Sequence, residues 1–262
     1  MQPLRIDNVS KTFRGSTREV EVLRAFELEV AAGEFVSLVG LSGCGKTTLL
    51  RLIVGLDSQY EGSIYLGSQR LNGPSRKRGI IFQEPRLFPW LSVERNVALA
   101  LDDEHRKHAN GTVQEHLELV GLKGFEKVFP TQLSGGMAQR AAIARALVAN
   151  PDVLLLDEPL GALDALTRLY MQKELERIWE REKNTMVMVT HDIDEAIQLS
   201  DRVVILSSRP GRVKRIIRVD LPRPRNRESD EFAALREEIL REFNLMESGL
   251  ACSRKGINGE GI

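Results

Sequence analysis

Short apolar segments separated by turn residues lie near the N-terminus and predict β-strands. Strands are expected at residues 4–9, 20–30, 35–39, 61–67 and 79–83. Further apolar segments without a polar residue lie at 153–156, 186–189 and 203–206. Such uninterrupted segments are typical of parallel strands that are covered on both faces.

Helical spacing of apolar residues separates these strands. Met171, Leu175, Ile178 and Trp179 lie on one face of a predicted helix. Residues 84–150 become helical in pattern, so we expect a helical subdomain inserted in the domain 1–220. The alternation of strands and helices predicts an α/β fold with a mainly parallel sheet core, an N-terminal antiparallel β part and this helical subdomain.

The C-terminal part divides into a linker, a helix and a tail. Pro222-Arg223-Pro224-Arg225 is interpreted as a solvated linker, and Phe232, Leu235, Ile239 and Phe243 predict an amphipathic helix within 221–247. We expect residues 248–262, which contain Gly and Ser, to be a disordered tail.

Composition and charge narrow the function classes. The 262 residues carry 37 Lys+Arg and 37 Asp+Glu, and this zero net charge disfavours nucleic-acid binding. The two cysteines suit a reducing compartment. No signal peptide and no apolar stretch of membrane-spanning length is found, so any role at a membrane requires a partner protein.

The segment Gly40-Leu41-Ser42-Gly43-Cys44-Gly45-Lys46-Thr47 fits the phosphate-loop pattern G-x-x-x-x-G-K-[ST]. It follows the strand 35–39 and precedes a predicted helix at 48–54, which Gly55 ends. Backbone N–H groups of such a loop surround phosphates, Lys46 reaches the β and γ phosphates, and the Thr47 hydroxyl holds Mg²⁺. The alternative is a chance glycine-rich turn, which the flanking strand and helix disfavour.

Two carboxylates follow the apolar strand 153–156. Asp157 at the strand's carboxyl end is suited to hold Mg²⁺, and Glu158 could polarise an attacking water. The alternative for Asp157 is that it caps the next helix.

A second helix start with glycines lies at Leu133-Ser134-Gly135-Gly136-Met137-Ala138-Gln139-Arg140. Ser134 is a good N-cap, and the open N–H groups make a second anion site. We interpret this loop as closing on a nucleotide held by another copy of the chain, the alternative being an ordinary helix start.

Together with 160–165 (LGALDA) and 189–192 (VTHD), these motifs resemble the ATP-binding subunits of ABC transporters in order and spacing over about residues 1–220. The resemblance implies a P-loop NTPase of the ABC ATPase type, a head-to-tail homodimer with two ATP molecules, and ATP hydrolysis with Mg²⁺. It assigns Glu158 as general base, with His191, Gln83 and Lys46 in catalysis, and Thr47, Gln83 and Asp157 at the metal. The implied ATP contacts are Phe13, Gly40, Leu41, Ser42, Gly43, Cys44, Gly45, Lys46, Thr47, Thr48, Ser134, Gly135, Gly136 and Asp164. Phe13 would stack on adenine, the alternative being a packed strand residue.

Residues 82–93, 164–168 and 221–225 are similar to importers of nitrate, taurine and aliphatic sulfonates, the last being the nearest likeness. This implies permease subunits, an external solute-binding protein acting through them, and a peripheral place at the cytoplasmic face of the inner membrane. Leu87, Phe88, Pro89 and Trp90 form an apolar segment that could seat a helix of the permease, or could be buried under the helical subdomain. A DNA-repair or chromosome-organising ATPase is disfavoured, because only 50 residues separate Gln83 from Leu133 and they contain no heptad repeat.

Overall fold

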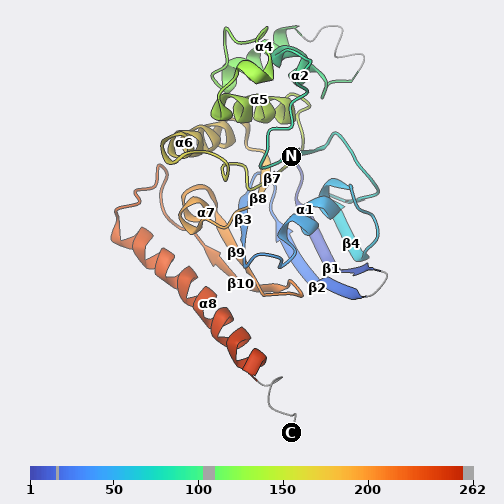
Figure 1. The fold of residues 1–262 in the computed structure, drawn as a ribbon, viewed down its shortest axis with the longest axis vertical. Coiled ribbons are helices and arrows are strands. Elements are labelled where there is room, and N and C mark those ends of the chain that lie inside the picture. Colours follow the sequence, from blue (N-terminus) through green and yellow to red (C-terminus); the bar gives the residue numbers. More distant parts are fainter. Residues whose placement is uncertain (16–17, 103–109, 256–262) are drawn as a thin grey trace.

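The larger of two sheets forms the centre of the molecule. The computed structural model describes residues 1–15, 18–102 and 110–255 (Figure 1). The sheet has six strands in the order β10-β9-β3-β8-β7-β6. They are β10 (Val213–Arg218), β9 (Arg202–Leu206), β3 (Phe35–Val39), β8 (Thr185–Val189), β7 (Val153–Asp157) and β6 (Arg78–Ile81). Neighbours pair in parallel except β10, which is antiparallel to β9.

The smaller sheet is antiparallel and has the order β2-β1-β4-β5. Its strands are β1 (Leu4–Arg14), β2 (Glu19–Val30), β4 (Glu61–Leu66) and β5 (Gln69–Arg70). Helix α1 (Lys46–Val54) joins the two sheets, since its Leu49 and Leu50 share one buried cluster with Leu4 of β1 and Val36 of β3. The predicted combination of a mainly parallel core with an N-terminal antiparallel part is confirmed.

Helix α1 and the smaller sheet pack on one face of the larger sheet, and further helices cover its opposite face. There α6 (Ala165–Glu182) buries the predicted face of Met171, Leu175, Ile178 and Trp179. The ring centroid of Trp179 lies 6.2 Å from that of the phenyl ring of Phe35 in β3. Next to α6 stand α2 (Val93–Ala98), α4 (Asn110–Leu119), a 3₁₀ turn (Pro130–Gln132) and α5 (Gly135–Leu147), which form the helical subdomain at the top of Figure 1.

Strand β3 has the predicted bounds, but β1 extends beyond the predicted residues 4–9 as far as Arg14. Its added residues pair with β2, for example Lys11 with Leu23 and Arg14 with Glu19. Pairing with a neighbouring strand, rather than apolar patterning, therefore determines where β1 ends.

The interpretation of residues 222–225 as a solvated linker is wrong. Arg225 is only 7 % exposed, and its guanidinium donates to the carbonyls of Ile197, Gln198 and Ser200. Arg223 donates to the carbonyl of Leu199 and to Asp201. These carbonyls end helix α7 (Ile193–Leu199) and have no partner within the helix, so the two arginines cap it. Burial lowers the pKa of Arg225 to about 10, with Arg223 as a further cause, so it remains a cation at neutral pH.

Helix α8 (Asp230–Lys255) buries Phe232 and Ile239 of the predicted amphipathic face. Arg215 of β10 forms ion pairs with Glu238 and Glu242 of this helix. The helix continues past residue 248 to Lys255, so the prediction of a disordered tail is wrong for 248–255, while 256–262 lie outside the described residues. An existing helix propagates at little cost, which explains why Ser248 and Gly249 do not end it.

Within the described ranges, no helix combines the length and the apolar character needed to cross a membrane.

Glu195 of α7 carries a buried carboxyl group close to Thr190, the residue that follows β8. It is 3 % exposed and accepts a hydrogen bond from the Thr190 hydroxyl. Burial is the main reason why its pKa rises from 4.5 to about 7. The folded chain therefore binds a proton there between these two pH values that the unfolded chain has lost.

This linkage predicts that Glu195 lowers the free energy of unfolding as the pH rises from 4.5 to 7, by at most about 3 kcal/mol. We expect Glu195→Gln to remove this contribution, so that the variant is more stable than the parent at pH 8 by more than at pH 5. Urea unfolding at both pH values measures the effect, with the exposed Glu237→Gln as control. Equal pH dependence in the parent and in Glu195→Gln would contradict it.

Candidate functional site

The phosphate loop leaves β3 at Gly40 and enters α1 at Lys46. Gly43 and Gly45 have φ of 77° and 101°, which L side chains rarely adopt. A Cβ on Gly45 would also lie 2.8 Å from Leu23 Cδ2, so strand β2 packs directly on the loop. The first N–H groups of α1 are thereby presented to the cleft as an anion site.

Lys46 is 8 % exposed and lies within the curve of the loop. Its Nζ donates to the carbonyls of Gly40 and Leu41 at 2.6 and 3.2 Å. Cys44 is buried beside it, and burial raises the pKa of its thiol. The ammonium group thus lies among the loop carbonyls, and it can exchange these hydrogen bonds for hydrogen bonds to a phosphate.

Asp157 ends β7 opposite the loop, and its Oδ1 accepts a hydrogen bond of 2.9 Å from the Thr47 hydroxyl. Burial chiefly raises the pKa of Asp157, and the neighbouring Glu158 adds to the rise. A cation would relieve this buried charge. Among the described residues no cluster of three His, Cys, Asp or Glu side chains forms a metal cage. Thr47 and Asp157 nevertheless fit Mg²⁺, which is held in many phosphate sites by one or two protein oxygens together with phosphate oxygens.

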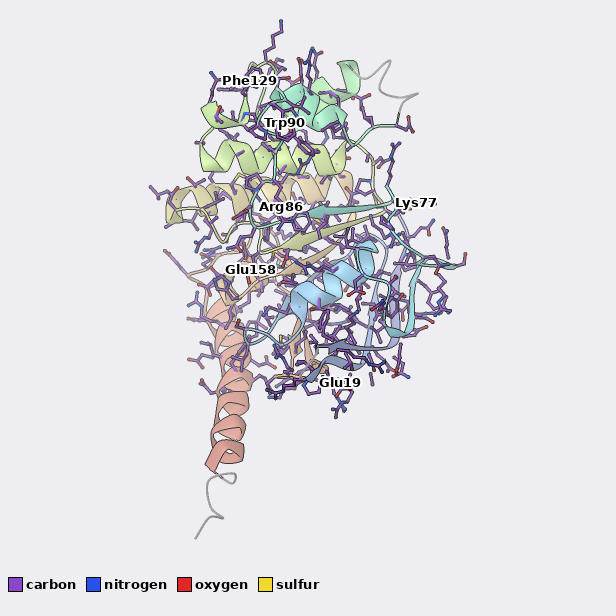
Figure 2. All side chains as sticks on the ribbon, turned by 45° about the vertical axis from the view of Figure 1, so that its right-hand side comes forward. Glu19, Lys77, Arg86, Trp90, Phe129 and Glu158 are labelled. Carbon is purple, nitrogen blue, oxygen red and sulfur yellow. The ribbon has the colours of Figure 1, made fainter. Side chains whose placement is uncertain are left out.

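Glu158 and His191 face each other across the same cleft, with Glu158 Oε2 3.2 Å from His191 Nδ1. Glu158 has a φ of 48°, and its N–H donates to the carbonyl of Val189 in β8. A Cβ on Gly161 would lie 3.3 Å from Gln83 Nε2 and 3.6 Å from Glu158 Oε2. Three predicted catalytic side chains, Glu158, His191 and Gln83, therefore converge. In Figure 2, Glu158 lies below the helical subdomain, and Arg86 lies between Glu158 and that subdomain.

The phosphate loop, Glu158 and His191 border one open cleft of about 520 Å³, within the usual range of ligand sites, whereas Gln83 and Asp157 are not among its lining residues. It is lined by Phe13, Val20, Val22, Gly40, Ser42, Gly43, Gly45, Lys46, Thr47, Thr48, Glu158, His191 and Arg209. Phe13 is 44 % exposed, so it is not a fully packed strand residue, and its ring is available for stacking on a planar base. The Lys11 ammonium lies 4.8 Å from that ring.

The second glycine loop does not border this cleft. Ser134 caps α5 by accepting from the Met137 N–H at 3.3 Å, as predicted for an N-cap. Gly136 adjoins α6, where an added Cβ would lie 2.6 Å from Thr167 Cγ2. Asp164 caps α6, and its hydrogen bonds with Thr167 lower its pKa. Ser134, Gly135, Gly136 and Asp164 are thus absent from the lining of this cleft of their own chain.

Two residues of interest are absent from the predicted set. Gln139 of α5 is buried, and its amide donates to the carbonyl of Phe82, the residue before Gln83. Arg209 lines the cleft and follows the carboxyl end of β9. The carboxyl end of a parallel strand is where α/β sheets bind ligands, and this position is the signal that could have identified Arg209.

Known proteins are similar to this chain in sequence and in fold. Residues 23–161 match the family model described as ABC transporter. The aliphatic sulfonates import ATP-binding protein SsuB of Bacillus cereus (strain ATCC 10987 / NRS 248) is 52 % identical over 91 % of this chain and 94 % of its own. SsuB of Bacillus subtilis (strain 168) is 49 % identical, over 90 % of this chain and 92 % of its own.

Two further similarities are more distant in role or in sequence. The bicarbonate transport ATP-binding protein CmpC of Synechococcus elongatus is 47 % identical over 90 % of this chain, but over 37 % of its own length. The dimeric, post-hydrolysis structure of the ATP-binding cassette MJ0796 bound to ADP and Pi superimposes with a TM-score of 0.70 and 34 % identity, covering 82 % of this chain and 98 % of that one. Since the family model spans more than half of the sequence and close relatives span about nine tenths of it, the chain belongs to the ABC transporter family.

Proposed function

We propose that this chain is the ATP-hydrolysing subunit of an ABC importer for a small anionic solute, namely aliphatic sulfonates. The observation that carries the proposal is the single cleft in which the phosphate loop, Glu158 and His191 meet, in a chain about half identical to two sulfonate import ATP-binding proteins. Nitrate or taurine import is the alternative, and the similarity to a bicarbonate transport protein keeps other small anions in view. A non-transport ATPase of the family is the weaker alternative.

In this proposal the chain's own residues bind and orient the nucleotide. The loop N–H groups, Lys46 and Thr48 hold the phosphates, and Phe13 stacks on the adenine. Thr47, Asp157 and Gln83 would hold Mg²⁺, which supplies charge neutralisation on the phosphates. Glu158 orients the attacking water and accepts its proton, while His191, 3.2 Å from Glu158, fixes the carboxylate and reaches the γ-phosphate.

The second glycine loop supports a homodimer. Ser134 and the glycines after it present N–H groups at the start of α5, a 13-residue helix, yet the cleft of their own chain lies elsewhere. We infer that they close on the ATP of a second copy, with Asp164 at the interface. The dimeric arrangement of the similar MJ0796 cassette supports this inference.

An apolar surface on the helical subdomain is the proposed contact with the permease subunits. Trp90 is 69 % exposed and its ring lies 5.3 Å from that of Phe88, so the alternative of burial under the subdomain fails for both residues. Buried Asn96 fixes the loop by hydrogen bonds to the N–H and carbonyl of Phe88 and to the carbonyl of Leu91. Phe129 lies on the same subdomain (Figure 2). A rigid, exposed aromatic pair is typical of a protein interface.

In the assembly that we propose, the permease holds the chain peripherally at the cytoplasmic face of the inner membrane. An external solute-binding protein delivers the solute to that permease. No nucleic acid takes part.

The substrate is tested by growth. A strain that lacks this protein should lose growth on an alkanesulfonate as sole sulfur source, keep growth on sulfate, and be rescued by the parent gene but not by Lys46→Ala. Taurine as sulfur source and nitrate as nitrogen source test the alternatives in parallel. Normal growth on the alkanesulfonate would contradict sulfonate import and leave the ATPase assignment intact.

The proposed base is tested by Glu158→Gln, which keeps the shape of the side chain and removes the proton acceptor. We expect ATP hydrolysis to fall by at least about 100-fold, while ATP still binds and holds the variant as a stable dimer. Phosphate release and light scattering with ATP measure the two properties. The control is Glu180→Gln, at an exposed position of α6. A monomeric ATP-bound Glu158→Gln protein would argue against the closed dimer.

The permease contact is tested by Trp90→Ala in vesicles reconstituted with the permease. Because Trp90 is exposed, we expect the fold and ATP binding to be kept and transport per ATP hydrolysed to fall several-fold. Leu240→Ala on α8, also a large exposed apolar residue, is the matched control. Unchanged transport in Trp90→Ala would overturn the docking assignment.

A further inference from the structure

The turn that joins β9 to β10 contributes Arg209 to the lining of the proposed nucleotide cleft. β9 pairs in parallel with β3, so its carboxyl end lies beside the point where β3 enters the phosphate loop. Arg209 follows that end and borders the same cleft as Lys46 and His191. The turn is thus in the position where parallel sheets bind ligands.

The turn is fixed by its backbone and by close packing. The Gly211 N–H donates to the carbonyl of Val22, and its carbonyl accepts from the Arg24 N–H. A Cβ on Gly211 would lie 2.1 Å from the carbonyl oxygen of Cys44, so the turn rests on the phosphate loop itself. The Ser207 hydroxyl donates to the carbonyl of Pro210 across the turn. Arg209 is therefore presented from a rigid base.

The guanidinium of Arg209 contacts the phosphate loop. Its Nε donates to the carbonyl of Gly43 at 3.1 Å, and the side chain is exposed to the cleft. In the described part of the chain this is its one hydrogen bond, and no carboxylate forms an ion pair with it. Its neighbour Arg212, in contrast, lies close enough to a carboxylate to interact with it. The hydrogen bond from Arg24 is the main cause that lowers the pKa of Glu21, and the charge of Arg212 lowers it further.

The hydrogen-bond partners of Lys46 resemble those of Arg209. Its ammonium also rests on neutral loop carbonyls, those of Gly40 and Leu41. A phosphate oxygen carries negative charge and binds a cation more strongly than a carbonyl does. Arg209 keeps its two Nη groups for such a ligand, and a guanidinium suits bidentate binding to phosphate.

We propose that Arg209 binds the phosphate chain of the nucleotide, as a third element beside the phosphate-loop N–H groups and Lys46. The inference rests on the proposed nucleotide site and adds to it a residue outside the motifs that define that site. On binding, Arg209 exchanges the Gly43 carbonyl for a phosphate oxygen, so its charge contributes to affinity for ATP and ADP but not for adenosine.

The experiment uses fluorescent N-methylanthraniloyl ATP, ADP and adenosine with the purified full chain. Arg209→Gln keeps an N–H donor for the Gly43 carbonyl and removes the charge. We expect it to weaken ATP and ADP binding by about 10-fold, to leave adenosine binding unchanged and to make the salt dependence shallower. Arg209→Lys should retain part of the affinity. The melting temperature without nucleotide should stay within about 2 °C of the parent.

Arg212→Gln, an exposed arginine of the same turn, is the matched control and should bind like the parent. Parent-like binding of ATP by Arg209→Gln would overturn the proposal. If Arg209→Ala then bound ATP more weakly than both, the role of Arg209 would be to tether the phosphate loop through the Gly43 carbonyl. An equal loss in Arg212→Gln would reduce the effect to general charge and also overturn it. If the parent itself failed to bind ATP, the proposed nucleotide site would fail instead.

Discussion

The phosphate loop can adopt this conformation because glycine, which has no side chain, occupies the positions where the loop and its neighbours approach most closely. An added Cβ on Gly45 would contact Leu23, one on Gly40 would lie 2.8 Å from Cys44 Sγ, and one on Gly211 would lie 2.1 Å from the Cys44 carbonyl. β2, the loop and the β9–β10 turn are therefore packed against one another through glycine. This contact joins the antiparallel sheet to the parallel one and orients α1 so that its N-terminus faces the cleft.

Charge is distributed along the cleft in a way that follows from this packing. Lys46 and Arg209 lie at the loop, where the phosphates of a nucleotide are negative. Asp157 and Glu158 lie opposite, at the carboxyl end of β7, where the proposed mechanism places a metal ion and a water molecule. Burial raises the pKa of Asp157 because no cationic side chain offsets its charge fully, which is suited to a site completed by a cation.

Local patterns in the sequence were sufficient for the parts of the structure that depend on neighbouring residues. The strand, loop and helix around Lys46 were predictable, because glycine spacing and apolar continuity are local properties. The capping of α7 by Arg223 and Arg225 was not, since their partners lie more than 20 residues away and a Pro-Arg repeat has the composition of a linker. Arg209 was missed for the same reason, because its partner Gly43 is 166 residues distant in sequence.

The helical subdomain holds both ends of the segment that runs from Gln83 to the exposed aromatic pair of Phe88 and Trp90. Gln139 of α5 donates to the carbonyl of Phe82, next to Gln83, and Arg145 of the same helix donates to the carbonyls of Pro85 and Arg86 at 2.9 and 2.8 Å. Further along, Asn96 of α2 holds the backbone of Phe88. A rotation of α5 and α2 as one body therefore moves this whole segment. In the proposed importer, occupancy of the cleft and force on the aromatic surface would be linked through these side-chain-to-backbone hydrogen bonds, so the coupling would depend on Gln139, Arg145 and Asn96.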